Sequence, residues 1–256
     1  MNPIFLQLGP ITISYYGLMA GCGFLAALGL LNFNRKFANL TSDEASNLIF
    51  IALICGVLGS RIFYVIQFFD QFRNNLWDII RIDKGGLVFY GGFFLALIVT
   101  LIYCRKKSLD PIRVLDVMVP SLALGHAFGR VGCFMHGCCY GKPTTLPWGV
   151  QYPINSAPFY HYGEELLHPV QIYETICNIV ICAIALVLIR KCKRGVTISF
   201  YFVAYGLIRF LDEFLRGDHF RRNNFTIAQL IGFCILPIGV IALIKFLRQE
   251  DCIEND

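Results

Sequence analysis

Long runs of apolar residues alternate with short polar segments along the whole chain. Seven of these runs are long enough to cross a bilayer as helices, because a span needs about 20 mostly apolar residues. They cover residues 14–33, 48–69, 87–104, 114–135, 169–189, 196–215 and 226–247. The pattern therefore predicts an all-α integral membrane protein, built as a single polytopic domain over residues 1–256.

Basic residues are unevenly distributed among the segments that connect these runs. Twelve would share one side of the membrane: Arg35, Lys36, Arg105, Lys106, Lys107, Arg113, Arg190, Lys191, Lys193, Arg194, Lys245 and Arg248. The connecting segments on the opposite side hold seven. The positive-inside rule then predicts an N-terminus outside and a C-terminus in the cytoplasm. The segment MNPIFLQLGPITIS has no basic n-region and no small-residue cleavage site, so we expect it to be retained.

Composition agrees with a membrane protein. Only 15% of the residues are charged, against about 25% in soluble domains, and the mean hydropathy is +0.61. The net charge of +5 is explained by the basic segments on the expected cytoplasmic side, so we expect no nucleic-acid partner. The longest connecting segment, at about residues 136–168, falls on the expected outer side and contains four prolines. Loops of this length in compact proteins are usually functional.

The stretch GHAFGRVGCFMHGCCYG, from Gly125 to Gly141, carries the most unusual chemistry in the chain. It places Arg130 inside an apolar helix, where a charge costs about 2.5–3.5 kcal/mol even on the lenient insertion scale. Such a residue is a candidate for a functional site. The structural alternative is an ion pair that locks two helices together.

Two further arginines lie within predicted spans. Arg209 and Glu213 are four residues apart, a spacing that lets opposite charges meet on one helix face. Two intramembrane arginines on one side suit an anionic group, because guanidinium binds phosphate oxygens as a planar fork. Arg61 lies nearer the middle of its helix and is a candidate for substrate binding or for a structural role.

The run GGLVFYGG, from Gly85 to Gly92, places Tyr90 and Gly91 at the start of a predicted helix. Missing side chains there would leave backbone N–H groups open to an anion. The alternative is an interfacial tyrosine among packing glycines. Tyr16 is open to the same two interpretations, since aromatic residues are common at the headgroup level.

Cys133, Cys138 and Cys139 cluster near His126 and His136. Thiolates and imidazoles are zinc ligands, but the spacing is unlike the usual zinc patterns, so we expect neither a metal nor another cofactor. On an oxidising face, a disulfide that uses two of these three is more to be expected than a metal, and the sequence leaves open whether one forms. A catalytic thiol would need a lowered pKa, which sequence cannot supply.

Taken together, these fragments resemble the prolipoprotein diacylglyceryl transferases of the bacterial inner membrane. The matching fragments are YYGLM, GSRIFY, GGLVFYGG, GRVGCF with a downstream YG, HPVQIYE and RFLDEFLRGD, in that order. The resemblance implies that Arg130 binds the phosphatidylglycerol headgroup and that Arg209 and Glu213 belong to the active site. It also implies that Tyr16 and Gly91 line that site, and that Gly141 closes the motif that contains Arg130.

The chain departs from the best-known form of this family at three positions. It has Tyr90 in place of a histidine, Cys133 in place of an asparagine and Cys138 in place of a glutamate. The residue that acts as the base is therefore open among Tyr90, Glu213 and His136.

The expected reaction transfers the diacylglyceryl group of phosphatidylglycerol to the lipobox cysteine of a prolipoprotein. It forms a thioether and releases glycerol phosphate, in a multi-pass inner-membrane protein whose active site faces the periplasm. Two other functions stay open from the residues alone. One is a membrane thiol-disulfide oxidoreductase that uses Cys133, Cys138 and Cys139, and the other is a transporter in which the arginines only bind an anion or lipid.

Overall fold

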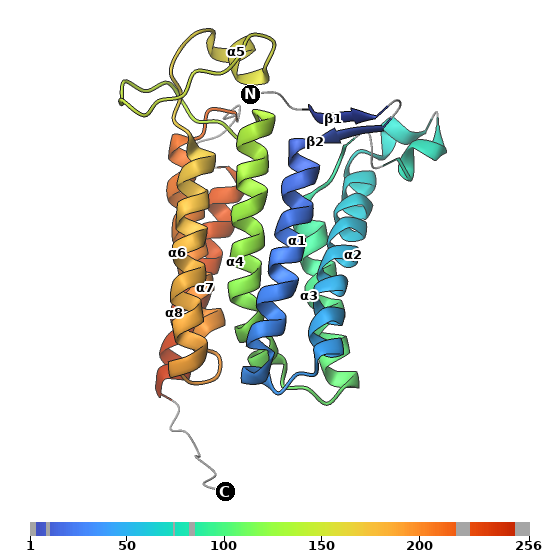
Figure 1. Ribbon diagram of the computed structural model, residues 1–256, viewed down its shortest axis with the longest axis vertical. Coiled ribbons are helices and arrows are strands. Elements are labelled where there is room, and N and C mark those ends of the chain that lie inside the picture. The colour runs from blue at the N-terminus through green and yellow to red at the C-terminus, as the bar shows by residue number, and fades with distance from the viewer. Residues whose placement is uncertain (1–3, 9–10, 74, 82–84, 219–225, 249–256) are drawn as a thin grey trace, which may run out of the picture. The chain divides into compact units, whose positions relative to one another are not determined.

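The structure is a computed structural model that describes residues 4–8, 11–73, 75–81, 85–218 and 226–248. Its elements are β1 (Ile4–Leu8), β2 (Ile11–Ser14), α1 (Tyr15–Asn34), α2 (Ser42–Gln67), α3 (Phe89–Lys106), α4 (Pro111–His136), α5 (Ala157–Tyr162), α6 (Val170–Lys191), α7 (Val196–Leu215) and α8 (Ile227–Arg248), with 3₁₀ turns at Arg35–Ala38, Phe69–Phe72 and Leu76–Ile79 (Figure 1).

The chain is mostly helical, and each of the seven predicted apolar runs coincides with a long helix. Within the described residues, six helices are long and apolar enough to cross a membrane: α1, α2, α3, α4, α6 and α8. The remaining long helix, α7, contains Arg209, Asp212 and Glu213 in every stretch of 18 residues, which lowers its apolar character. The protein is thus a helical membrane protein with six candidate spans.

Two local features differ from the sequence prediction. Helix α2 begins at Ser42, six residues before the predicted run, because Thr41 and Glu44 form a capping box. The Glu44 N–H donates to Thr41 Oγ1 at 3.2 Å and the Thr41 N–H donates to Glu44 Oε2 at 2.9 Å. Near the N-terminus, β1 and β2 form an antiparallel hairpin, with Leu8 opposite Ile11. Hydropathy alone detects neither feature, since both lie outside the long apolar runs.

The helices fall into two compact units, one comprising residues 1–30 and 115–256 and the other Leu31–Val114. In the second unit α2 and α3 pack closely through glycines, because a Cβ atom at Gly91 or Gly92 would collide with the backbone of α2. These glycines make the close helix contact possible.

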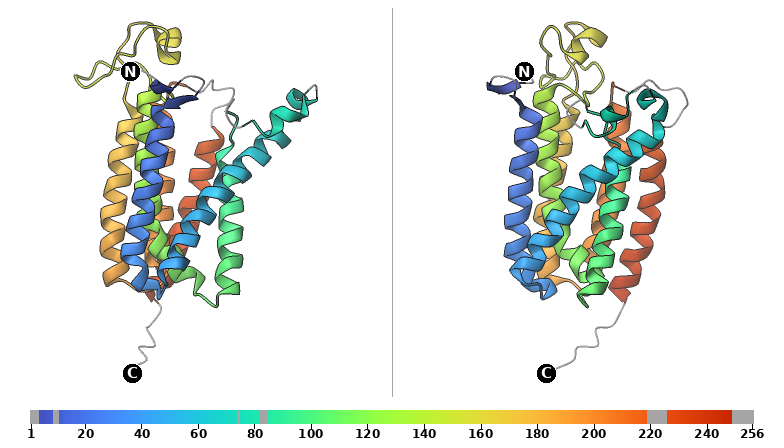
Figure 2. Two further views of the ribbon diagram at one scale, coloured as in Figure 1. Left: turned by 45° about the vertical axis from the view of Figure 1, so that its right-hand side comes forward. Right: turned by 90° about the vertical axis from the view of Figure 1, so that its right-hand side faces the viewer.

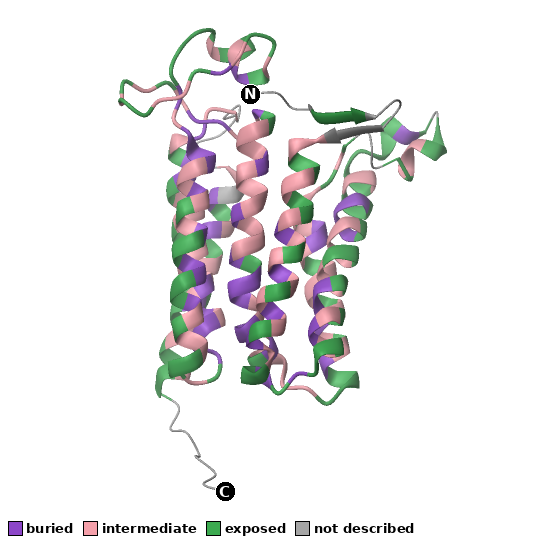
Figure 3. Ribbon diagram, viewed as in Figure 1, coloured by how far each residue is buried: buried purple, intermediate pink, exposed green. Residues whose placement is uncertain are grey.

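In the first unit, α4, α6 and α7 share a core that contains Val119, Ala123, Ile181, Ala185 and Tyr201. Helix α4 is the most buried of the six candidate spans (Figure 3). Asp116 on α4 accepts hydrogen bonds from the N–H groups of Gly195 at 2.6 Å and Ile198 at 2.8 Å. This carboxylate satisfies N–H groups at the start of α7 that have no partner within the helix, which explains one of the charged residues inside an apolar run.

The segment between α4 and α6 forms a cap over one end of these two helices (Figures 1 and 2). It contains α5 and closes against the helices near Gly141. The Gly141 N–H donates to the His168 carbonyl at 3.0 Å, and the Gly217 N–H donates to the Tyr140 carbonyl at 3.0 Å. Three backbone segments therefore meet at Gly141, where a Cβ atom would collide with His168.

Candidate active site

Arg130 forms an ion pair between α4 and α6. Its Nε lies 2.5 Å from Oε2 of Glu174, and Nε also donates to Nε2 of His126 at 3.1 Å. Both contacts use Nε, so among the described residues neither terminal nitrogen of Arg130 has a hydrogen-bond partner. The structural alternative raised from the sequence, an ion pair between helices, is present. The same geometry leaves the end of the guanidinium fork for an anion.

Arg209 forms the second ion pair of this region. Its Nη2 lies 3.1 Å from Oε2 of Glu213, four residues along α7, as the spacing predicted. The Nη1 atom of Arg209 is buried and has no hydrogen-bond partner among the described residues. A buried guanidinium nitrogen without a partner is costly, so this atom is a favourable place for an acceptor on a ligand.

The two arginine systems meet at a small cavity enclosed by α4, α6 and α7. It is lined by His126, Glu174, Asn178, Ile181, Tyr205, Ile208, Arg209 and Asp212. The cavity has a volume of about 10 Å³, which is room for about one water molecule. The cavity thus joins one member of each ion pair in a single polar site within apolar helices.

Glu174, Asn178 and Asp212 line the cavity but were not predicted as site residues. Glu174 and Asp212 each have a buried carboxylate oxygen without a hydrogen-bond partner in the described structure. Intramembrane carboxylates are themselves functional signals, so Glu174 in HPVQIYE and Asp212 in RFLDEF could have been found. Glu213, which was predicted, pairs with Arg209 and is not among the residues that line the cavity.

Tyr16 belongs to the same unit and lies against α4. A Cβ atom at Gly132 would sit 3.2 Å from Cδ2 of Tyr16, so the glycine makes room for the aromatic ring. Tyr16 keeps 48% of its surface exposed. It therefore packs against α4 at Gly132, two residues from Arg130 in the sequence, while remaining accessible, which is compatible with either of its predicted roles.

The three clustered cysteines lie just past Arg130, at the end of α4. All three are free thiols, and their Sγ atoms lie within 4.8 Å of one another. Within the described residues, neither His126 nor His136 joins the set that could hold a metal. His126 is instead turned toward Arg130, while His136 is exposed at the helix end.

The thiols of this cluster differ in acidity. Hydrogen bonds from Cys133 and Cys138, together with the positive charges of Arg216 and Arg130, hold the pKa of Cys139 well below its usual range, despite burial. The pKa of Cys138 is raised, because its thiol shares hydrogen bonds with Cys133 and Cys139 and is partly buried. Cys139 is therefore the most acidic member of the cluster.

The second unit holds the other predicted residues. All five N–H groups of Arg61 are used by backbone carbonyls, those of Asp78, Ile79, Arg81, Gly85 and Gly86. The Arg61 guanidinium also lies over the rings of Tyr64 and Phe72, 5.6 and 5.5 Å from their centroids. This geometry favours the structural alternative for Arg61, namely to fix the segment that precedes α3.

Tyr90 and Gly91 lie in the first turn of α3. The Tyr90 ring makes an edge contact with Phe89, with centroids 5.7 Å apart. Gly91 is buried against α2, which agrees with a packing glycine. Because Tyr90 and Gly91 belong to the second unit and Arg130 to the first, their part in a common site stays a prediction.

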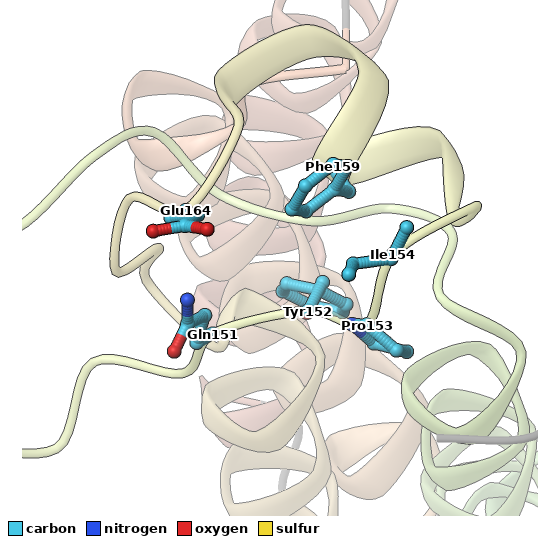
Figure 4. Close-up of a pocket in the computed structure, with 6 residues that line it drawn as sticks. All are labelled: Gln151, Tyr152, Pro153, Ile154, Phe159 and Glu164. Carbon is cyan, nitrogen blue, oxygen red and sulfur yellow. The ribbon is translucent and has the colours of Figure 1, made fainter.

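The cap contains an open groove of about 330 Å³, lined by Gln151, Tyr152, Pro153, Ile154, Phe159 and Glu164 (Figure 4). The cap is tied to α6 by Gln171, whose Nε2 donates to the Cys138 carbonyl at 2.6 Å and to the Tyr152 hydroxyl at 3.1 Å. Burial raises the pKa of Tyr152 to about 12. The phenol therefore stays neutral and acts as a hydrogen-bonding group that fixes the cap.

Comparison with known proteins identifies the family. The family model described as prolipoprotein diacylglyceryl transferase matches residues 3–245. The chain therefore belongs to the prolipoprotein diacylglyceryl transferase family, a family of transferases. The resemblance found in the sequence is confirmed.

Several relatives match nearly the full length of the chain. A phosphatidylglycerol–prolipoprotein diacylglyceryl transferase of Clostridium tetani (strain Massachusetts / E88) is 37% identical over 94% of this chain and 96% of its own length. Proteins of the same name from Clostridium kluyveri and Finegoldia magna are 33% and 31% identical, and in both cases at least 95% of each chain is covered. No relative named here supports the oxidoreductase alternative.

Proposed function

We propose that this protein transfers the diacylglyceryl group of phosphatidylglycerol to the thiol of a lipobox cysteine in a prolipoprotein. The cysteine sulfur attacks the glyceryl carbon that carries the phosphate. A carbon–sulfur bond forms, the carbon–oxygen bond to phosphate breaks, and glycerol phosphate leaves with the bonding electrons. The proton of the thiol passes to a base.

The observation that carries this proposal is a cavity among apolar helices that joins the ion pairs of the two arginines, because Arg209 and the Arg130 partner Glu174 both line it. Arg130 contributes two terminal nitrogens and Arg209 contributes Nη1, and none of these three atoms has a hydrogen-bond partner among the described residues. Guanidinium groups with free donors bind phosphate oxygens strongly in a site of low dielectric. They would also stabilise the negative charge of the departing phosphate, an effect worth about 2.7–4 kcal/mol per donor in other enzymes.

The carboxylates keep this site stable before lipid binds. Glu174 and Glu213 neutralise the two arginines, which would otherwise be isolated charges within the membrane. A phosphate that approaches the fork ends can be accommodated without breaking the Nε contact of Arg130. In this account Glu174 and Glu213 position the arginines, and the arginines act on the lipid.

The candidates for the base that accepts the thiol proton are Tyr90, Glu213 and His136. The structure adds Asp212 as a fourth. Asp212 lines the cavity and has a buried oxygen without a hydrogen-bond partner in the described part of the chain. Glu213 is engaged by Arg209, and His136 is exposed. Tyr90 takes either a proton-transfer role or a hydrogen bond to the lipid phosphate.

The remaining features of the proposal concern the membrane. The protein would lie in the bacterial inner membrane with seven spans, its N-terminus outside, its C-terminus in the cytoplasm and its active site toward the periplasmic face. The polar residues support this placement, because Arg130, Glu174 and Arg209 all lie near the helix ends that join the cap. Arg130 is six residues from the end of α4, or about 9 Å at 1.5 Å per residue.

The function is tested by incubating the purified protein with labelled phosphatidylglycerol and a lipobox peptide. The proposal requires label on the peptide cysteine and stoichiometric release of glycerol phosphate. A peptide whose cysteine is replaced by serine serves as the control and should remain unlabelled. Turnover of thiols and disulfides without lipidation would favour the oxidoreductase alternative.

A further inference from the structure

The cysteines at the end of α4 form a group that has no role in the mechanism proposed above. Cys133, Cys138 and Cys139 carry free thiols whose Sγ atoms all lie within 4.8 Å of one another. In tetrahedral zinc sites each sulfur lies about 2.3 Å from the ion, which places sulfurs about 3.8 Å apart. The three thiols therefore need to close by only about 1 Å to surround one ion.

The backbone turn at the end of α4 creates this arrangement. The N–H groups of Gly137 and Cys138 both donate to the Cys133 carbonyl, at 3.0 and 3.1 Å, and Gly137 has a φ of +80°. This left-handed glycine ends the helix and turns the chain back over its last turn, so that Cys138 Sγ approaches the Cys133 carbonyl at 3.7 Å.

Cys139 follows with a second unusual backbone conformation. Its φ of +60° lies in the left-handed region, which side chains other than those of Asn and Asp rarely adopt. Hydrogen bonds hold the chain on both sides, from Gln171 to the Cys138 carbonyl at 2.6 Å and from Gly217 to the Tyr140 carbonyl at 3.0 Å. Unfavourable backbone conformations held in this way gather at ligand sites and active sites.

We propose that Cys133, Cys138 and Cys139 bind one thiophilic cation of the Zn²⁺ or Cd²⁺ type through three thiolates. The thiols release their protons on binding, and the fourth ligand position remains open to water or another donor. Three thiolates and a divalent ion leave one negative charge, close to the guanidinium groups of Arg130 and Arg216, which are themselves paired with Glu174 and Asp218. The ion would tie the start of the cap to the last turn of α4, three residues from Arg130.

The test is a titration of the reduced, purified full-length protein with Cd²⁺ under anaerobic conditions, followed by the ultraviolet charge-transfer absorption of cadmium–thiolate bonds. We expect saturation at one ion per chain and competition by Zn²⁺. Each of Cys133→Ser, Cys138→Ser and Cys139→Ser should weaken binding at least tenfold. Cys192→Ser should leave it unchanged, because Cys192 is exposed at the end of α6 and outside the cluster.

A second measurement uses the unaltered protein and so does not depend on the folding of any variant. Alkylation with and without Cd²⁺, mapped by mass spectrometry, should show protection of all three clustered cysteines and continued labelling of Cys192. Absence of cadmium–thiolate absorption in the reduced protein, or protection of fewer than three of these cysteines, would overturn the proposal. Both readouts are independent of lipid transfer, so they remain decisive whether or not the proposed enzymatic function holds.

Discussion

Arg130 Nε on α4 lies 2.5 Å from Glu174 Oε2 on α6, while its two terminal nitrogens have no hydrogen-bond partner among the described residues. One side of the guanidinium thus secures the packing of two helices, and the other side keeps donors that a ligand can use. A structural ion pair and an anion-binding group are therefore compatible in one residue. This relationship yields a direct prediction about Glu174.

Glu174→Gln should lower the thermal midpoint of unfolding, because it leaves Arg130 as a buried charge without a partner. Breaking one side of a buried ion pair costs about 3–5 kcal/mol. Added phosphatidylglycerol should recover more of the midpoint in this variant than in the unaltered protein, because the lipid phosphate replaces the lost countercharge. Thermal unfolding in detergent, with and without the lipid, measures both effects.

Glu164→Gln is the matched control for that experiment, since Glu164 lies at the exposed groove of the cap. It should change neither the midpoint nor the response to lipid. An equal lipid response in the Glu174 variant and the unaltered protein would mean that the phosphate does not approach Arg130.

Arg61→Lys should destabilise the protein and leave phosphatidylglycerol affinity unchanged in the fraction that folds. The five carbonyl contacts of Arg61 require a planar fork, and an ammonium group can make at most three of them. Hydrogen bonds to a charged group contribute about 1.5–3 kcal/mol each. Thermal unfolding and lipid binding should be measured on the same preparation. A stable variant with weakened lipid binding would instead support a substrate-binding role for Arg61.

Tyr90→Phe separates two roles for the phenol. If Tyr90 only donates a hydrogen bond to the lipid phosphate, the variant should bind phosphatidylglycerol more weakly, by about 0.5–1.5 kcal/mol and up to about 3 kcal/mol, with little change in turnover of bound lipid. If Tyr90 transfers a proton, turnover should fall about a hundredfold with binding intact. We expect the first result, because an ordinary tyrosine with a pKa near 10 is a poor base at neutral pH.

Tyr90→His extends this test to the base. A histidine variant that turns over faster than the unaltered protein would indicate that the position can serve as the base. A variant with no gain would make Asp212 the next candidate for the base. The corresponding experiment is to measure lipid binding and peptide lipidation together in Asp212→Asn.

The orientation is tested by labelling single cysteine probes in sealed cells with a reagent that cannot cross the membrane. A probe at Asn155 in the cap should react from outside, and a probe at Ser108, between α3 and α4, should react only after the membrane is opened. The unsubstituted chain provides the background from its native cysteines. Reaction of the Ser108 probe in sealed cells would reverse the proposed topology.

The long apolar runs were sufficient to predict the positions of the long helices, because hydropathy is a local property. The start of α2 was predicted too late, although Thr41 and Glu44 carry a recognisable capping box, because the first polar turns of a helix do not add to an apolar run. The pairing of Arg209 with Glu213 was predictable because it too is a local property: both residues lie on one helix, four positions apart.

The site required the tertiary structure. Glu174 is 44 residues from Arg130 in the sequence, and only the packing of α6 against α4 brings the two together. The convergence of three thiols depends on left-handed residues at Gly137 and Cys139, which the spacing of the cysteines does not indicate. The positions of Tyr90 and Gly91 relative to Arg130 remain predictions for a related reason, because they lie in the other compact unit.

Lipidation by Arg130→Lys tests the central claim most directly. The variant keeps the positive charge beside Glu174 but loses the fork that binds phosphate, so transfer of labelled diacylglyceryl to a lipobox peptide should fall at least about a hundredfold. Arg113→Lys, in the exposed first turn of the same helix, should transfer normally. Wild-type transfer by a folded Arg130→Lys protein would contradict the account, because Arg130 would then have no part in the reaction.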